Sequence, residues 1–267
     1  MRVARTIAEA RDALRGARGA TIGLVPTMGA LHRGHVSLLD AARRECDDVV
    51  ASVFVNPAQF APGEDHDLYP RDEAGDLRVL ADAGVDVAFL PSADEMYPPG
   101  FQTWVDVTEL SRGLEGAARP GHFRGVATVC LKLFLIIEPT HAYFGRKDAQ
   151  QAEVIARLVS DLALPIEIRV LPTVRDADGV ALSSRNAYLT AEEREAARAL
   201  PRALEAGAEA HRAGADAAEA ARASLAEEPR LLPEYVEVAG WNGHLVLAAA
   251  VQAGTTRLID NVVLEGE

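Results

Sequence analysis

Short apolar segments recur along the first two thirds of the chain, and stretches of helical periodicity lie between most of them. They cover residues 21–25, 49–55, 85–90, 142–144 and 166–171, and several are dense in Val, Ile and Phe. Strands that are apolar on both faces and alternate with helices are typical of a parallel sheet with helices packed on both sides. We therefore predict an α/β fold, a Rossmann-like doubly wound parallel sheet, in which ligands bind beyond the carboxyl ends of the strands.

The pattern changes after Pro172. Residues 190–193 have the order of a capping box and open a helical region that runs to about Glu228, punctuated by Pro201 and Gly214. Three segments of strand composition follow at 235–238, 244–249 and 256–263, with turns expected at Gly240 and Gly254. The C-terminal part is therefore predicted to be a smaller α+β domain.

A chain of 267 residues is long enough for one or two domains with a large core. We predict a Rossmann-like ligand-binding domain over residues 1–172. A smaller domain over residues 173–267 is expected to cap the cleft of the first.

Three further features bear on where the protein works. Residues 1–17 mix basic and acidic side chains with apolar residues at helical spacing, so we interpret them as an amphipathic helix and not as a targeting peptide. The longest apolar run, 126–137, contains Lys132 and is too short to span a membrane. Cys46 and Cys130 form neither a Cys-x-x-Cys pair nor a disulfide framework. We expect a cytoplasmic protein with reduced thiols and no membrane partner.

Residues 26–35 read Pro-Thr-Met-Gly-Ala-Leu-His-Arg-Gly-His and join a strand end, a glycine turn and the start of a helix. The first N–H groups of a helix have no partner within it, and together with the positive end of the helix dipole they favour phosphate. His32 and His35 share one face of the first turn, where imidazoles donate to phosphate oxygens and exchange protons near neutral pH. The segment indicates the nucleotide site of an adenylate-forming enzyme.

Two other interpretations of His32 and His35 stay open on these residues alone. They are a pair of zinc ligands, or incidental histidines at the cap of a surface helix. A metalloprotease-type pair is spaced i, i+4 with a Glu between the histidines, whereas Arg33 and Gly34 stand between them here. The spacing disfavours the metal pair. The helix-cap interpretation can be set aside only if other segments of the chain also indicate a nucleotide site.

The formal net charge of −13 argues against a nucleic-acid-binding surface, because affinity for a phosphate backbone comes from clustered Lys and Arg. It also disfavours anionic ligands at long range, so a nucleotide site has to gather its cations locally. The candidates are Arg119, Arg124, Lys132, Arg146, Lys147 and Arg185.

Six ordered blocks show that the chain, to about Asn186, resembles the pantothenate synthetase (pantoate beta-alanine ligase) family of the nucleotidyltransferase superfamily, which carries a His-x-Gly-His motif. The blocks are residues 26–35, 54–60 (Phe-Val-Asn-Pro-Ala-Gln-Phe), 69–71 (Tyr-Pro-Arg), 119–126 (Arg-Pro-Gly-His-Phe-Arg-Gly-Val), 144–151 (Phe-Gly-Arg-Lys-Asp-Ala-Gln-Gln) and 183–186 (Ser-Ser-Arg-Asn). The resemblance implies ligation of pantoate to beta-alanine through a pantoyl-adenylate, with release of AMP and pyrophosphate.

The resemblance also implies roles for single residues. His35 would be the proton donor to the phosphoryl oxygens, His32 a second phosphate contact, and Lys147 and Arg185 further catalytic groups. ATP would be bound by Met28, Gly29, Ala30, Leu31, His32, Arg33, Gly34, His35, Gly145, Arg146, Lys147, Asp148, Val174, Leu182, Ser183, Ser184 and Arg185. Val174 would touch the adenine through its backbone, and residues 182–185 would form a mobile phosphate loop. Gln59 would hold pantoate and beta-alanine, and Gln151 pantoate.

Plainer interpretations of the same residues exist. Lys147 and Asp148 could be a surface ion pair, residues 183–186 an ordinary polar turn, and Gln59 and Gln151 amides that satisfy backbone groups. At the level of the whole chain, the alternatives are a nucleotidyltransferase that stops at an adenylated product and a non-catalytic nucleotide-binding regulator.

The family further implies Mg²⁺ carried on the ATP phosphates and a homodimer. Tyr69, Asp76, Glu115 and Arg119 match family positions near the site, but we assign no metal ligand. Three positions depart from the family pattern. Residues 138–140 (Glu-Pro-Thr) lack the Asp that is usual after the proline. Leu135 stands where Asn is usual, which puts one polar contact of its helix in doubt, and Leu182 stands where Met is usual, which preserves apolar bulk.

Overall fold

The computed structural model describes residues 1–16, 19–241 and 243–264. The chain divides into two compact units. The first comprises Met1–Gly145 and Gln150–Leu171, and the second comprises Arg146–Ala149 and Pro172–Glu267. The short segment 146–149 therefore groups with the C-terminal unit, which a single division of the chain at residue 172 does not anticipate.

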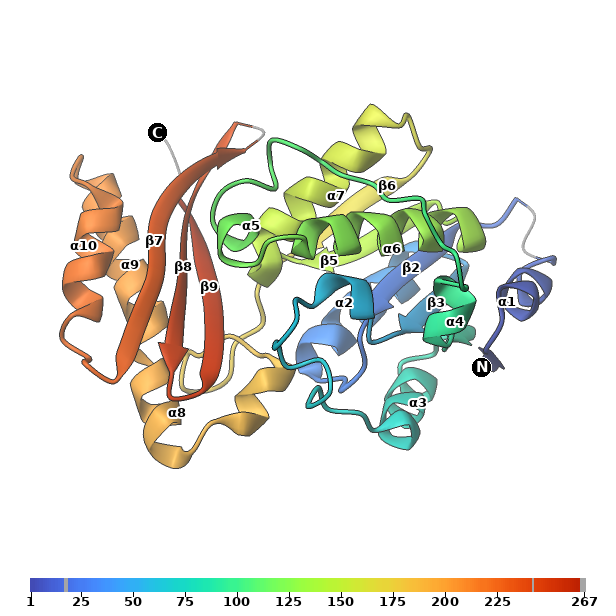
Figure 1. Ribbon diagram of the computed structural model, residues 1–267, viewed down its shortest axis with the longest axis horizontal. Coiled ribbons are helices and arrows are strands. Elements are labelled where there is room, and N and C mark those ends of the chain that lie inside the picture. The colour runs from blue at the N-terminus through green and yellow to red at the C-terminus, as the bar shows by residue number, and fades with distance from the viewer. Residues whose placement is uncertain (17–18, 242, 265–267) are drawn as a thin grey trace. The chain divides into compact units, whose positions relative to one another are not determined.

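The first unit is built on a six-stranded sheet in which every pair is parallel (Figure 1). Its strands are β1 (Arg2–Ala4), β2 (Ile22–Thr27), β3 (Asp48–Val53), β4 (Val87–Phe89), β5 (His141–Gly145) and β6 (Glu167–Leu171). Their order across the sheet is β1-β4-β3-β2-β5-β6. This confirms the predicted doubly wound α/β fold.

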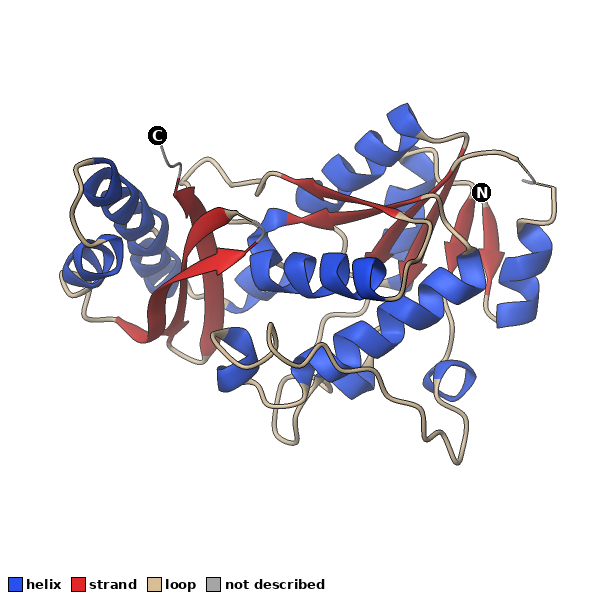
Figure 2. Cartoon of the chain, turned by 90° about the horizontal axis from the view of Figure 1, so that it is seen from above, coloured by secondary structure: helices blue, strands red, loops and turns tan. Residues whose placement is uncertain are grey.

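Helices cover both faces of this sheet (Figure 2). They are α1 (Ile7–Ala13), α2 (Arg33–Glu45), α3 (Glu73–Asp82), α4 (Ala93–Met96), α5 (Glu115–Ala118), α6 (His122–Ile137) and α7 (Ala149–Asp161), with the short 3₁₀ turn η1 (Pro57–Gln59). The 3₁₀ turn η2 (Arg146–Asp148) follows β5 and groups with the second unit. Consecutive strand residues enter different cores, as side chains of a strand must. Leu24 packs in the core that contains α6 and α7, and Val25 in the core that contains α2 and α3.

The order of the strands reverses between β2 and β5, because β3 and β4 lie on one side of β2 while β5 and β6 lie on the other. Such a reversal is the topological switch point of an open parallel sheet, and ligands bind at its carboxyl edge. The segments that follow β2 and β5 are residues 28–35 and 146–151. The fold thus explains why two distant blocks of the sequence carry candidate site residues.

The prediction of one helix over residues 1–17 is wrong at its start. Residues Arg2–Ala4 form the edge strand β1, and Val3 pairs with Ala88 of β4. The helix begins only at Ile7, where Thr6 and Glu9 form a reciprocal capping box. The end of the predicted helix, at Ala17, lies outside the described residues.

The second unit packs helices on an antiparallel sheet of order β7-β8-β9 (Figure 1). Its elements are the 3₁₀ turn η3 (Ser184–Tyr188), α8 (Ala191–Ala197), α9 (Ala199–Arg212), α10 (Ala217–Leu225), β7 (Leu231–Trp241), β8 (His244–Ala253) and β9 (Thr256–Leu264). Leu200 and Leu204 of α9 share a core with Leu247 of β8.

Several local predictions for this unit are confirmed. Thr190 and Glu193 make both bonds of a capping box, and Gly254 has a left-handed φ of +57° between β8 and β9. The turn predicted at Gly240 is wrong, because Gly240 lies inside β7 and pairs with Leu245. Gly243, directly before β8, has a left-handed φ of +83°. Within the described residues, no helix combines the length and the hydropathy that crossing a membrane requires.

Candidate functional site

The loop after β2 has an unusual backbone. Gly29 and Ala30 both have left-handed conformations, with φ of +86° and +50°. A Cβ atom added to Gly29 would lie 2.8 Å from Oδ2 of Asp76 and 3.1 Å from Cγ1 of Val53. Position 29 therefore requires glycine both for its conformation and for the close approach of Asp76.

Asp76 of α3 fixes this loop. Its side chain is buried, with the residue 4% exposed. Oδ2 accepts the N–H of Ala30 at 3.0 Å and Oδ1 accepts the N–H of Leu31 at 2.8 Å. Each carboxylate oxygen thus binds one backbone donor, and the geometry assigns Asp76 the role of an anchor for the loop.

His32 and His35 cap α2 reciprocally. Nδ1 of His32 accepts the N–H of Gly34 at 3.1 Å, and Nδ1 of His35 accepts the N–H of His32 at 3.2 Å. The two rings face each other with centroids 4.1 Å apart. Because each Nδ1 is an acceptor, these hydrogen bonds assign the proton of each neutral ring to Nε2.

These contacts correct one part of the sequence argument. Unpaired N–H groups at the start of the helix are expected from the sequence to point at a bound anion, yet the N–H of Gly34 has a protein acceptor, as do the N–H groups of Ala30, Leu31 and His32 in the loop before the helix. The motif therefore presents imidazoles whose orientation is fixed by the backbone. Arg33 is the exposed first residue of the helix.

The segment after β3 holds Gln59 in place. Nδ2 of the buried Asn56 donates to Oε1 of Gln59 at 3.0 Å and to the carbonyl of Gly125 at 3.2 Å. Nε2 of Gln59 donates to the sulfur of Met28 at 2.9 Å. This joins the strand ends of β2 and β3, and a thioether sulfur is only a weak acceptor for that amide.

Helix α6 approaches this segment closely. A Cβ on Gly125 would lie 2.2 Å from the carbonyl oxygen of Ala58, so a larger residue would push η1 away. Nδ1 of His122 donates to the carbonyl of Gln59 at 2.9 Å. Burial, and then the charge of Arg119, lower the pKa of His122 to about 4, so the ring is neutral at pH 7.

Gln150 and Gln151 have different roles. Nε2 of the buried Gln150 donates to the carbonyls of Leu110 and Gly113 at 2.7 and 2.9 Å, and its Oε1 accepts the N–H of Glu115 at 3.0 Å. Gln150 therefore satisfies backbone groups, which is the plain structural role also considered for Gln151. Gln151 is partly exposed at the start of α7.

Three of the candidate cations of the first unit are engaged locally. Arg119 makes two hydrogen bonds to Glu64, at 3.0 and 2.7 Å, and the two side chains are largely buried. Arg124 pairs with Asp106 at the surface. Nζ of Lys132 lies 5.0 Å from the ring centroid of Phe101.

In the second unit, Lys147 is held in a defined place. Its Nζ lies 3.7 Å from Oδ1 of Asp148, and its own side chain is 19% exposed while that of Asp148 is 45% exposed, so the lysine is the more buried partner of the pair. The carbonyls of Arg146 and Lys147 each accept a hydrogen bond from Nδ2 of Asn261 at 2.9 Å. The side chain of Arg146 is exposed.

Residues 174–186 form a hairpin followed by a turn. Leu182 donates its N–H to the carbonyl of Val174 at 2.9 Å, and Ser183 caps η3 by accepting the N–H of Arg185 at 3.3 Å. Nδ2 of Asn186 donates to the carbonyl of Ala181 at 2.9 Å. Ser184 and Arg185 are the first two residues of η3. The segment is thus an ordered turn, as the polar composition of 183–186 allows.

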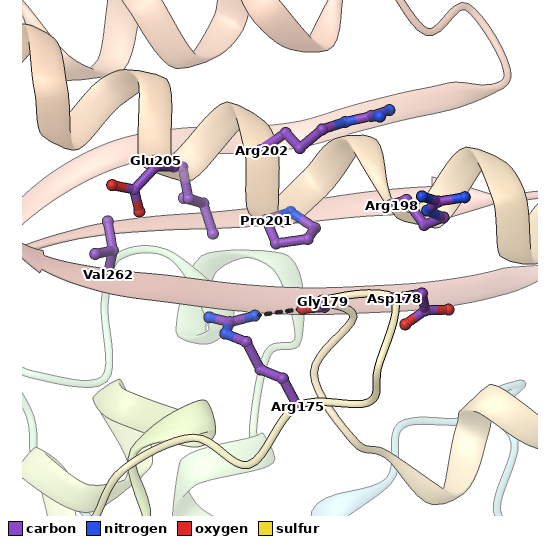
Figure 3. A pocket seen from close by; sticks show the side chains of 9 residues that line it. Arg175, Asp178, Gly179, Arg198, Pro201, Arg202, Glu205 and Val262 are labelled. Carbon is purple, nitrogen blue, oxygen red and sulfur yellow. Dashed lines mark hydrogen bonds between the residues drawn. The ribbon is translucent and has the colours of Figure 1, made fainter.

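A pocket of about 300 Å³ opens in the second unit beside this hairpin (Figure 3). Its lining includes Arg175, Asp178, Arg198, Arg202 and Glu205. Most of these charges have partners: Arg175 pairs with Asp260, Asp178 with Arg194, and Arg198 with Glu195. The pocket is therefore nearly balanced in charge and lacks the excess of cations that a triphosphate requires.

Among the described residues, no three His, Cys, Asp or Glu side chains gather as metal ligands would. Cys46 and Cys130 are buried free thiols, and burial raises the pKa of Cys130 to about 12. Neither the zinc interpretation of His32 and His35 nor a reactive thiol gains support from this geometry.

Comparisons with known proteins match one family along nearly the whole chain. The family model for pantoate-beta-alanine ligase matches residues 2–263. A pantothenate synthetase of Chloroflexus aurantiacus is 54% identical over 282 residues, covering 100% of this chain and 99% of that protein. One of Moorella thermoacetica is 51% identical over 280 residues, covering 99% of each.

Solved structures agree as well. A pantothenate synthetase of Thermus thermophilus is 46% identical with a TM-score of 0.95, and all of both chains is covered. A pantoate-beta-alanine ligase of Francisella tularensis, solved in complex with beta-gamma ATP and beta-alanine, is 36% identical with a TM-score of 0.83, covering 100% of this chain and 99% of that one. By its fold, its histidine motif and these matches, the chain belongs to the pantoate-beta-alanine ligase family.

Proposed function

We propose that this ligase condenses pantoate with beta-alanine to give pantothenate, using ATP and releasing AMP and pyrophosphate. The observation that carries the proposal is the reciprocal pair His32 and His35 at the carboxyl end of β2, beside the switch point of a parallel sheet. The full-length match to the pantoate-beta-alanine ligase family and to pantothenate synthetases supports the same reaction. It does not favour an enzyme that stops at an adenylated product.

The chemistry requires an activated acid. A carboxylate is a poor acyl donor because its leaving group would be oxide. Attack of the pantoate carboxylate on the α-phosphorus forms an oxygen–phosphorus bond and expels pyrophosphate. The amine of beta-alanine then attacks the acyl carbon of pantoyl-adenylate, expels AMP and loses a proton. The protein has to align the reactants and neutralise the charge that builds on the phosphates.

The imidazoles suit the first step. With both Nδ1 atoms bound to backbone N–H groups, Nε2 is the protonated nitrogen of each ring, so His35 and His32 donate to phosphoryl oxygens through Nε2–H. A neutral ring keeps this proton, so His35 acts as the hydrogen-bond donor to the phosphoryl oxygens as their charge builds. Residues 28–31 shape the loop that precedes them, with Asp76 holding its backbone.

Gln59 and Gln151 hold the small substrates in this proposal. The Gln59 amide has its oxygen fixed by Asn56, and its N–H rests on a weak sulfur acceptor. A carboxylate oxygen is a stronger acceptor, so pantoate or beta-alanine can replace the sulfur without moving the residue. Gln151 is assigned to pantoate, and its partly exposed position at the start of α7 is compatible with that role.

The second unit supplies the remaining ATP residues in this proposal. Lys147 and Arg185 neutralise the charge of departing pyrophosphate, Asp148 fixes the lysine or the ribose, and the backbone of Val174 contacts adenine. Arg146, Leu182, Ser183 and Ser184 complete the contribution of this unit, and Gly145 at the end of β5 belongs to the first unit. Residues 1–172 bind nucleotide and pantoate, and the domain 173–267 caps their cleft during turnover.

ATP is proposed to enter as its Mg²⁺ complex. Both oxygens of Asp76 already accept backbone N–H groups, which fits a magnesium ion carried by the nucleotide phosphates and water and not by a protein cage. We also propose that the protein works as a homodimer in the cytoplasm, where two isolated free thiols stay reduced. Light scattering of the purified protein tests the dimer.

The test of the function is isotope exchange between pyrophosphate and ATP. Adenylation is reversible without the amine, so pantoate alone should support exchange. Adding beta-alanine should consume the pantoyl-adenylate and yield pantothenate. Exchange without any consumption of beta-alanine would instead identify an enzyme that stops at the adenylate. Absence of both would identify a nucleotide-binding protein without this catalysis.

A further inference from the structure

Two consecutive residues of the last strand, Asp260 and Asn261, point to opposite faces of β9. Side chains alternate along a strand, and Leu258 and Leu264 of the same strand pack in the core with α9. Asp260 belongs to that face. Asn261 belongs to the other, yet it is only 7% exposed, because the segment around Lys147 lies against it.

Asn261 binds the main chain of the Lys147 segment. Its Nδ2 donates to the carbonyls of both Arg146 and Lys147 at 2.9 Å, which uses both of its amide protons. Its Oδ1 is buried without a partner among the described residues. A buried acceptor of this kind costs stability, so the packing of β9 alone does not explain an asparagine here.

Asp260 binds the hairpin that leads into residues 182–185. Arg175 donates to its two oxygens at 2.5 and 3.0 Å, and the N–H of Asn261 donates to Oδ1 at 2.8 Å. The same guanidinium donates to the carbonyl of Gly179 at 3.1 Å (Figure 3). The hairpin is therefore tied to the strand next to the point where Asn261 ties the Lys147 segment.

We propose that Asp260 and Asn261 are positioning residues for adenylation. Together they form the β9 clamp, which sets the main chain of Lys147 and the hairpin before Leu182 at a fixed distance within the C-terminal unit. The clamp touches no substrate and acts through Lys147 and the phosphate loop. This inference rests on the proposed role of those segments in binding ATP.

Asn261→Leu is the main test, since leucine has nearly the same size and removes the two donors. We expect adenylation from pantoate and ATP to fall roughly 10- to 100-fold, with a higher KM for ATP, because small misplacements of a catalytic group have effects of that order. Conversion of supplied pantoyl-adenylate and beta-alanine to pantothenate should be unchanged. Hydrogen exchange of the amides of residues 146–149 should become faster.

Two further variants complete the design. Asp260→Asn should speed amide exchange in residues 175–182 and leave residues 146–149 unaffected. Thr256→Val is the matched control on the same strand: its hydroxyl is buried and has no partner in the described part of the chain, so neither half-reaction nor exchange should change. If Asn261→Leu fails to fold, Asn261→Asp replaces it in the same test, because aspartate keeps the shape of the side chain and removes the NH₂ donor of the amide.

Lys147→Met separates this inference from the proposed function. If that variant loses adenylation while a folded Asn261 variant keeps normal adenylation and normal exchange at 146–149, the clamp is refuted and the function stands. Equal losses in both half-reactions of a folded Asn261 variant also refute it, because they indicate a general structural role. If the parent protein shows no adenylation with pantoate, the proposed function fails, and the clamp as a device for adenylation fails with it.

Discussion

Asp76→Asn separates an anchor for the loop from a magnesium ligand. The native carboxylate accepts two backbone N–H groups, those of Ala30 and Leu31, at 3.0 and 2.8 Å. An amide in the same place has one acceptor oxygen and turns an NH₂ group toward the other donor. One charge-assisted bond is lost, the remaining bond is weakened, and a backbone N–H faces a donor.

The expected cost follows from those contacts. A hydrogen bond to a charged group contributes about 1.5–3 kcal/mol, and leaving a buried donor without a partner costs about 1–3 kcal/mol. We therefore expect Asp76→Asn to lower the free energy of unfolding by about 2–4 kcal/mol. The loss should be present without ATP and without Mg²⁺, because the bonds are internal to the protein.

Urea unfolding of the ligand-free protein in a chelating buffer measures this cost. The chain has two tryptophans, so a Trp241→Phe background leaves Trp104 as a fluorescent reporter in the first unit. The matched control is Asp72→Asn at the N-cap of the same helix. Asp72 caps α3 by accepting the N–H of Gly75, and asparagine caps equally well, so stability should be preserved. An Asp76→Asn protein as stable as its parent, with a raised Mg²⁺ requirement, would refute the anchor and identify a metal ligand.

Four other substitutions test three separate parts of the account. His35→Ala should slow adenylation by about 10²- to 10⁴-fold in a folded protein, measured by pyrophosphate exchange, and a near-normal rate would remove His35 as the donor to the phosphoryl oxygens. Gln151→Ala should raise the KM for pantoate far more than that for ATP, while Gln150→Ala, which releases the loop 110–115, should lower the melting temperature; the reverse pattern would exchange their roles. The folded pKa of His122 is near 4 and lies below the ordinary value of 6.5, so its contribution to stability is present above about pH 6.5 and is lost as the pH falls toward 4. Between pH 6.5 and 4 the His122→Gln protein should lose less unfolding free energy than the parent protein. An equal loss in both proteins would contradict the lowered pKa of His122.

The sheet was predictable because its central strands consist mostly of apolar residues. Segments such as 49–55 are apolar on both faces, which in a chain of this length favours a buried parallel strand. Edge strand β1 has only three residues, one of them buried, so the helical spacing of its neighbours masked it. The conformation of Gly29 was suggested by the sequence, whereas that of Ala30, with φ +50°, was not.

Contacts between distant segments were the part that sequence reasoning missed. Nothing near His32 indicates that its loop is held by a carboxylate of α3, or that the two histidines cap their helix in place of the usual Ser and Glu. Asp260 and Asn261 lie in an ordinary strand pattern, and their partners are more than 80 residues away. Such residues become visible only when the topology brings the segments together.

The fate of the pantoate carboxylate oxygens tests the central claim most directly. If pantoate attacks the α-phosphorus and beta-alanine then displaces AMP, one carboxylate oxygen must leave with the phosphate. Pantoate carrying heavy oxygen in its carboxylate should therefore yield AMP with one labelled oxygen and unlabelled pyrophosphate, as read by mass spectrometry. Label in pyrophosphate, or label-free AMP alongside pantothenate formation, would contradict a pantoyl-adenylate intermediate.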